Sequence, residues 1–214
     1  MLKTALVLLM MIGLGVCSQT ILKAESKSAE DGKVAEVGKA ATAVVEDYYR
    51  MTVAGAPLEA VRESWNTQVL CESALGLSWY TMTKDEQKLT VESLEGLLAA
   101  PHQARSMVPI LKDMKWKVNS TRQVADGLFA VDTTFSIPTA EREYQTTFLV
   151  SINSEGAMSE GAKIIDSASD GRSSVRTMLG ERWMQATTTK KSPPAEFAAF
   201  VKGAREYIGA PAME

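Results

Sequence analysis

The sequence predicts an α+β fold in which helices pack on one face of a twisted antiparallel sheet of about four strands. Between residues 40 and 99, apolar residues recur at spacings of three and four, which is the period of amphipathic helices. From residue 115 to residue 166 they alternate with polar residues, as they do in half-buried strands. Helical spacing returns over residues 175–187 and 194–207, so helices precede and follow the run of strands.

Four helices are predicted before the strands. Thr83 and Glu86 have the spacing of a capping box, in which a hydroxyl and a carboxylate satisfy the free amides of a helix start. Pro101 is expected to end the helix that this box begins, and Gly76 interrupts the preceding helix. The expected helices are residues 40–51, a helix that starts at Pro57, residues 69–80 and residues 84–99.

Four strands are predicted in one antiparallel meander. Trp116 and Val118 alternate with polar residues in the first strand, and a turn at residues 125–127 leads to the second. A turn at residues 153–156 separates the third strand from a fourth over residues 162–166. The residues expected on the inward face are Phe129, Val131, Thr133, Phe135 and Ile137 in the second strand, and Tyr144, Thr146, Phe148, Val150 and Ile152 in the third.

The first residues predict export. Lys3 precedes an apolar run over residues 5–16, and small and polar residues follow, which is the order of a secretory signal peptide. The run is shorter than a transmembrane helix, which needs about 20 apolar residues. Lipidation at Cys17, which would tether the domain to a membrane, is an alternative to release as a soluble protein. We expect a signal peptide at residues 1–18, a polar tether at residues 19–39 and a folded domain at residues 40–208.

The composition indicates one globular domain that does not bind nucleic acid. The chain has 214 residues, of which 45% are hydrophobic and 23% are charged, which is typical of a globular protein. Its formal net charge is −3 and its pI is about 5.4. Nucleic-acid-binding domains generally carry a basic surface and a high pI, so that class of partner is not expected.

The sequence offers little catalytic or metal-binding material. A single histidine excludes a site built from several imidazoles, and no zinc or calcium spacing is present. His102 is expected at the surface, and Cys71 lies in an apolar stretch and is expected in the core. Asp132, Glu143 and Asp166 are the candidate acids if the fold encloses a cavity. We expect no catalytic residue, metal or cofactor.

The apolar residues allow two interpretations. The chain contains eleven methionines and four tryptophans, and flexible methionine side chains adapt well to irregular hydrophobic ligands. The same residues are also found in ordinary cores. Composition alone does not separate a plain core from a lipid pocket.

Two motifs resemble those of a known family. Leu75-Gly76-Leu77-Ser78-Trp79, followed by Thr83 and Gln87, is similar to the Leu-Gly-x-x-aromatic, Thr, Gln pattern of the MlaC family. The segment Asp166-Ser167-Ala168-Ser169-Asp170-Gly171-Arg172-Ser173 is similar to the Asp-x-x-x-acidic-Gly-x-Ser motif at the end of that family's last strand. The resemblance extends over residues 40–202. Members of the family are periplasmic phospholipid shuttles, also described as toluene-tolerance auxiliary components of an ABC transport system.

The resemblance implies a carrier without enzymatic activity. Its cone-shaped domain would hold the acyl chains of a phospholipid in an apolar pocket and exchange lipid with membrane-associated transport complexes. Arg172 and Arg176 are then the candidate contacts for a headgroup phosphate. Face alternation selects the expected pocket lining, which is Leu75, Leu94, Leu98, Phe129, Val131, Phe135, Phe148, Val150, Ile164 and Met178.

Two alternatives from other classes remain open at this stage. One is a small cone-shaped α+β enzyme that uses Asp132 or Asp166 in its cavity. The other is a lipoprotein tethered through Cys17 that serves as a scaffold for an envelope complex.

Overall fold

The computed structural model describes residues 31–104, 108–111, 113–137, 142–152, 161–169, 173–188 and 192–212. The predicted signal peptide, the turn predicted at residues 153–156 and Arg172 lie outside the described residues. Within the described part of the chain, no helix is long and apolar enough to cross a membrane.

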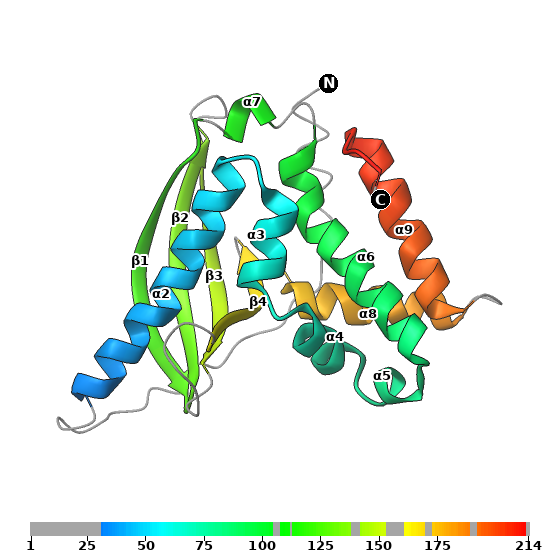
Figure 1. Ribbon diagram of the computed structural model, residues 1–214, viewed down its shortest axis with the longest axis horizontal. Coiled ribbons are helices and arrows are strands. Elements are labelled where there is room, and N and C mark those ends of the chain that lie inside the picture. The colour runs from blue at the N-terminus through cyan, green and yellow to red at the C-terminus, as the bar shows by residue number, and fades with distance from the viewer. Residues whose placement is uncertain are drawn as a thin grey trace.

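A four-stranded antiparallel sheet in the order β1-β2-β3-β4 forms one layer of the fold. Its strands are β1 (Lys115–Ala125), β2 (Leu128–Ile137), β3 (Arg142–Ile152) and β4 (Ala162–Ser169). Helix α2 (Asp31–Val53) crosses the sheet and contacts all four strands. Beyond α2, three helices follow one another away from the sheet, namely α3 (Pro57–Ser64), α6 (Lys84–Gln103) and α9 (Pro193–Ile208) (Figure 1). The predicted α+β fold is therefore confirmed.

The pairing of β2 with β3 places the predicted inward residues opposite one another. Phe129 lies opposite Val150, and Val131 lies opposite Phe148. All four side chains are buried, whereas the neighbouring Asp132 is partly exposed. Successive residues of a strand point to opposite faces, so burial follows the predicted alternation. This alternation brings the apolar side chains of the sheet together on the face that α2 covers.

Helix α2 begins at Asp31, earlier than the predicted start at residue 40. Gly38 lies so close to β1 and β2 that an added Cβ would meet Phe129 and Thr121 at 3.7 Å. Residues 31–39, which fall in the predicted polar tether, are helical, and Gly38 lies against the sheet. The polar composition of this segment does not reveal that contact, because it depends on a sheet formed far along the chain.

Gly76 divides one predicted helix into two. Helix α3 (Pro57–Ser64) begins at the predicted proline. Helices α4 (Thr67–Leu75) and α5 (Leu77–Thr81) then replace the single helix expected over residues 69–80. Between them Gly76 has a φ of +53°, a left-handed conformation that glycine adopts without the usual steric penalty.

Helix α6 (Lys84–Gln103) starts with the predicted capping box but does not stop where expected. Glu86 N donates to Thr83 Oγ1 at 3.3 Å, and Thr83 N donates to the Glu86 carboxylate at 2.9 Å. Pro101 lies inside the helix instead of ending it. The amide of Ala104 still donates to the carbonyl of Ala100 at 3.1 Å, so the missing amide of proline removes one bond of the last turn without ending the helix. A short helix that was not predicted, α7 (Val108–Leu111), follows.

Two helices close the chain after the sheet. Helix α8 (Val175–Thr187) packs on α4 and β4, and α9 (Pro193–Ile208) packs along α6. Arg205 fixes α9, because its guanidinium donates to the carbonyl of Gly96 at 2.6 Å and to Gln103 Oε1 at 2.7 Å. It also donates through Nε to the carbonyl of Pro211 at 3.1 Å, which holds the segment after α9 in place.

Candidate functional site

A cluster of aromatic rings fills the space between α2, α3 and the sheet. Phe148 of β3 lies with its ring centroid 5.9 Å from Tyr48, 5.7 Å from Tyr49 and 6.3 Å from Trp65. Tyr49 also stacks on Trp116 of β1 at 5.4 Å. We call these five residues the aromatic cluster. Rings from two helical segments and two strands thus form one continuous apolar surface inside the fold.

The polar atoms of this cluster are uncharged. Tyr49 Oη lies 3.0 Å from Thr133 Oγ1, which donates to the carbonyl of Thr146 at 3.0 Å. Burial raises the pKa of Tyr49 to about 12 and raises that of Tyr48 further. Both phenols therefore stay protonated at neutral pH. They can form hydrogen bonds inside the apolar space but bring no charge into it.

The residues expected to line a pocket are largely gathered in the same core. Leu98 and Phe135 are partly buried and pack against this core, and Met178 is half-buried. The lining of a lipid pocket by these residues stays a prediction, since burial in a core does not by itself distinguish the two interpretations. The buried members are Leu75, Leu94, Phe129, Val131, Phe148, Val150 and Ile164.

The sequence predicted His102 at the surface, but in the structure the residue is partly buried. Because α6 continues through Pro101, the imidazole packs edge-on against Tyr48, with ring centroids 6.3 Å apart. Its Nε2 lies 3.4 Å from the Tyr48 hydroxyl, and its Nδ1 is buried without a hydrogen bond to any described residue. Burial lowers the pKa of His102 to about 4, so the ring is neutral at neutral pH.

Cys71 is buried in the core, as predicted. Burial, with the nearby Glu95 and Glu72 carboxylates as smaller contributions, raises the pKa of its thiol to about 12. The reactive thiolate form is therefore scarce at neutral pH, which is the state of a structural cysteine and not of a nucleophile.

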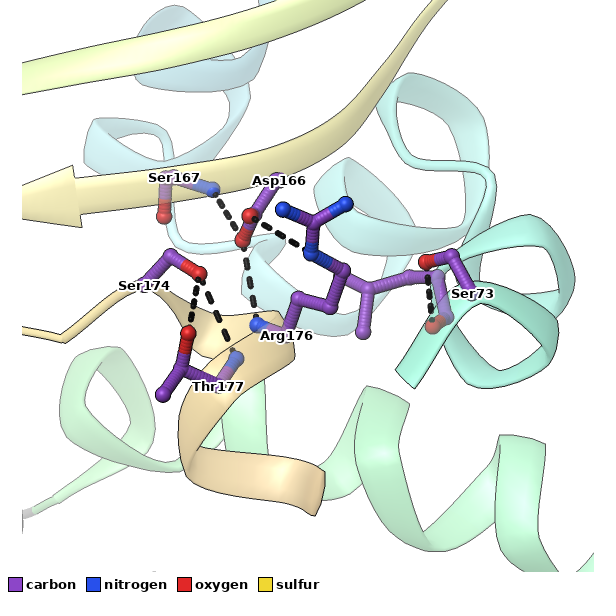
Figure 2. A network of polar contacts seen from close by, with 7 residues as sticks. Ser73, Asp166, Ser167, Ser174, Arg176 and Thr177 are labelled. Atoms are coloured by element: carbon purple, nitrogen blue, oxygen red, sulfur yellow. Dashed lines mark hydrogen bonds and ion pairs between the residues drawn. The ribbon is translucent and has the colours of Figure 1, made fainter. Parts of the chain in front are cut away.

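Asp166 holds the start of α8 on the end of β4 (Figure 2). Its Oδ1 accepts from the amides of Ser167 at 2.9 Å and Arg176 at 3.1 Å, and its Oδ2 lies 3.8 Å from Arg176 Nε. Ser174 caps the same helix by accepting from the amide of Thr177 at 3.3 Å. The free amides that begin α8 are thus used within the chain. Arg176, a candidate headgroup contact, is half-exposed and paired with this carboxylate.

The other candidate acids lie away from the aromatic cluster. Asp132 accepts from Ser120 Oγ and Thr147 Oγ1, both at 2.7 Å, on the face of the sheet opposite α2. Glu143 is exposed. Neither carboxylate faces the apolar interior, and Asp166 is occupied as a helix cap. Among the described residues, no group of three or more metal-ligating side chains is present.

The first sequence motif has a structural role. Trp79 is buried, and Gln87 Nε2 of α6 donates to its carbonyl at 2.9 Å. Gly76 supplies the break between α4 and α5, and Thr83 caps α6. These residues together fix the turn from α4 through α5 into α6. In the second motif, Asp166 caps α8, whereas residues 170–172 lie outside the described chain.

Comparison with solved structures finds the same fold in a phospholipid-binding protein from Ralstonia solanacearum, which was determined in complex with a phospholipid. The TM-score is 0.59, and the match covers 80% of this chain and 98% of that chain. The sequences are 12% identical, so the likeness establishes the fold alone. Comparison with protein-family models finds no match, and comparison with curated proteins finds no relative. The comparison thus supports the predicted fold, and the resemblance of the two motifs to the MlaC family stays a prediction.

Proposed function

We propose that the protein binds phospholipid and carries it across the periplasm between membrane complexes of an ABC-type lipid transport system. The observation that carries the proposal is the likeness of the fold to that of a phospholipid-binding protein, and the uncharged interior between α2, α3 and the sheet is compatible with it. That protein was solved in complex with a phospholipid, and the match extends over nearly all of that chain. We propose that the acyl chains bind in this interior.

The physical chemistry of the interior suits acyl chains. Removing each CH₂ group from water is favourable by about 0.8 kcal/mol, so a two-chain lipid is extracted only if most of both tails is enclosed. Two buried charged residues, Asp166 and Arg205, bind backbone groups in other parts of the fold. A charge facing the tails would be costly to desolvate. The neutral state of both tyrosines and of His102 avoids that cost.

A carrier function also requires export and release. The predicted signal peptide at residues 1–18 supports a periplasmic location, and we propose cleavage near Cys17. The mass of the mature chain tests this directly. A mass that corresponds to loss of the signal peptide supports a soluble carrier, whereas an added diacylglyceryl group on Cys17 would support the tethered form.

Lipid transfer between vesicles is the test of the function. Donor vesicles carry a self-quenched fluorescent phosphatidylethanolamine in phosphatidylglycerol, and acceptor vesicles contain neither probe nor quencher. The purified protein is expected to increase the rate of dequenching in proportion to its concentration. A rate equal to that without protein, from a sample that is folded by circular dichroism, would contradict the proposal.

A further inference from the structure

Three polar side chains meet beside the aromatic cluster. Tyr48 and Thr52 are one turn apart on α2, and His102 lies in the last turn of α6. The Tyr48 hydroxyl is 3.4 Å from His102 Nε2. The Thr52 hydroxyl lies close enough to the Tyr48 phenol to counteract part of the rise in its pKa that burial causes. We call these three residues the Tyr48 group.

The Thr52 hydroxyl differs from those of other threonines in the helices. Thr90 Oγ1 donates to the carbonyl of Glu86 at 2.8 Å, and Thr42 Oγ1 donates to that of Gly38 at 3.1 Å, each four residues back. Thr52 is 2% exposed, yet its Oγ1 makes no hydrogen bond of good geometry to any described residue. Buried hydroxyl groups are nearly always hydrogen-bonded. The Thr52 hydroxyl, with only its weak contact to the Tyr48 phenol, is therefore available to a ligand.

The imidazole of His102 is also incompletely paired, whichever tautomer it adopts. If the Tyr48 hydroxyl donates to Nε2, then Nδ1 carries a hydrogen that has no acceptor. If Nε2 donates to the Tyr48 oxygen, then Nδ1 is an acceptor without a donor. A phenol is the better donor and a neutral imidazole the better acceptor, which favours the first arrangement. In that arrangement, His102 Nδ1 is an unused donor, and Thr52 Oγ1, whose contact with the Tyr48 phenol falls short of good hydrogen-bond geometry, can rotate its hydrogen toward a ligand.

The surroundings of the group favour an uncharged acceptor. Arg50 and Asp47 pair with each other on the exposed side of α2. Arg205 donates to Gln103, next to His102, and to backbone carbonyls. With these charges engaged elsewhere, a phosphate bound at the group would be desolvated without a counter-charge, which is unfavourable. A carbonyl oxygen can accept from both donors without that penalty.

The group is continuous with the interior proposed to hold acyl chains. The Tyr48 ring contacts Phe148 at 5.9 Å and Trp65 at 6.0 Å, measured between centroids. Trp65 is 4% exposed, and its Nε1 is a third buried donor without a partner in the described chain. An apolar wall with a few unpaired donors matches the region of a diacyl lipid where the tails join the glycerol.

We propose that the Tyr48 group binds the ester carbonyl oxygens of a diacyl lipid, with Thr52 Oγ1 and His102 Nδ1 as donors. This inference rests on the proposed lipid binding and adds a preference for ester-linked over ether-linked lipids. It also predicts that the phosphate headgroup contributes little to selection, because the donors contact the glycerol ester region and not the phosphate.

The test compares two lipids that differ in the carbonyl groups. Diacyl phosphatidylglycerol and its dialkyl ether analogue, with equal chain lengths, are titrated against the delipidated protein. The diester is expected to bind about tenfold more tightly, the difference expected for loss of one or two buried hydrogen bonds. Equal binding of both lipids would overturn this inference and leave the proposed function standing. Absence of binding by either lipid would overturn both.

Two variants separate a ligand contact from a general effect on the fold. Thr52→Val removes the hydroxyl at nearly constant volume and is expected to abolish most of the ester preference while the ether lipid still binds. Thr90→Val is the matched control, since Thr90 is buried in a helix but its hydroxyl bonds a backbone carbonyl. The control is expected to keep the full preference. Loss of preference in the control, or its retention in Thr52→Val, would overturn the assignment.

The imidazole offers a direct readout, because His102 is the single histidine of the chain. In protein labelled with ¹⁵N and prepared without a histidine tag, the two ring nitrogens give signals that need no further assignment. Binding of the diester is expected to shift the Nδ1 signal, and binding of the ether analogue to leave it near its position in the free protein. Identical shifts with both lipids would contradict a carbonyl contact at His102.

Discussion

Buried polar groups are fully hydrogen-bonded in one part of the fold and incompletely hydrogen-bonded in another. At α8 and α9, the buried charges of Asp166 and Arg205 have their hydrogen bonds supplied by the chain itself. Beside the aromatic cluster, Thr52 and His102 are uncharged and keep unpaired atoms. Complete bonding is typical of polar groups that stabilise a fold, and the unpaired atoms beside the aromatic cluster are those that the proposed ester contact would use. The comparison predicts that changes at α8 and α9 lower stability at neutral pH, while changes beside the aromatic cluster alter binding and the pH dependence of stability.

The largest effect is expected from Arg205→Met. The substitution leaves three acceptor oxygens without their donor, namely the carbonyl oxygens of Gly96 and Pro211 and Oε1 of Gln103. Arg205 is 4% exposed, so these oxygens lie in a buried part of the fold. Loss of about 4 kcal/mol in the free energy of unfolding is expected, measured by urea denaturation.

The control for Arg205 is Arg182→Met. Arg182 lies over the Phe200 ring, 4.7 Å from its centroid, where a cation-π contact near the surface contributes only about 0.5–1 kcal/mol. Similar losses in the free energy of unfolding for the two variants would show that the hydrogen bonds of Arg205 do not hold α9 on α6.

The second effect is a dependence of stability on pH through His102. Burial lowers its pKa from 6.5 to about 4 in the folded protein. Between these values the unfolded chain binds a proton that the folded chain does not, so stability falls as the pH decreases from 6.5 toward 4. The loss reaches up to about 3 kcal/mol. Because the chain has one histidine, His102→Gln removes this contribution completely.

The measurement is the free energy of unfolding of both proteins between pH 7 and pH 4. Carboxylates titrate in both proteins, so their contribution cancels in the difference. The stability of the natural protein is expected to decrease relative to that of His102→Gln as the medium is acidified. A constant difference would mean that the imidazole is hydrated in the folded state.

A third and smaller effect is expected from Asp166→Ala. The carboxylate is 6% exposed and accepts from two amides, so its removal is expected to cost about 2 kcal/mol. Asp166→Asn keeps an oxygen in the same place and is expected to recover more than half of that loss. The stabilities of the natural protein and the two variants are compared by thermal unfolding. Equal losses for Asp166→Ala and Asp166→Asn would show that the negative charge of Asp166, and not its hydrogen bonds to the two amides, stabilises the fold.

The last prediction concerns the expected pocket. Phe135 is partly buried at the edge of the core and stacks on Tyr144, with centroids 4.9 Å apart. In the proposed pocket a charge at this place would face the acyl chains, so Phe135→Glu is expected to lower the amount of bound lipid about tenfold. Val124→Glu, at an exposed position of β1, is the matched control and is expected to bind normally. Equal lipid content in both variants would remove Phe135 from the pocket.

The sheet could be predicted from the sequence because alternation reports both the strand and its buried face. Phe129, Val131, Phe148 and Val150 are buried as that alternation requires. The capping box of α6 could also be predicted from the sequence, since its two residues are three positions apart and form hydrogen bonds within the same turn. Local patterns are enough for elements whose stabilising contacts are local.

The candidate site was less predictable because its contacts join distant segments. Tyr48 and His102 are 54 residues apart, and their contact depends on a helix that continues through Pro101. The early start of α2 likewise depends on β1 and β2. The sequence does not indicate that Arg205 is buried, because a basic residue near the end of a helix is common at a protein surface. Such residues are recognised only once the packing of α2, α6 and α9 is known.

The central claim is that the interior between α2, α3 and the sheet binds a diacyl phospholipid. The most direct test is a native mass spectrum of the mature protein purified from the periplasm, followed by solvent extraction of what it carries. The expected result is a mass excess equal to one phospholipid, recovered in the extract as an ester-linked diacyl species. A mass equal to that of the chain alone, unchanged after incubation with phosphatidylglycerol vesicles, would contradict the claim and identify the interior as an ordinary core.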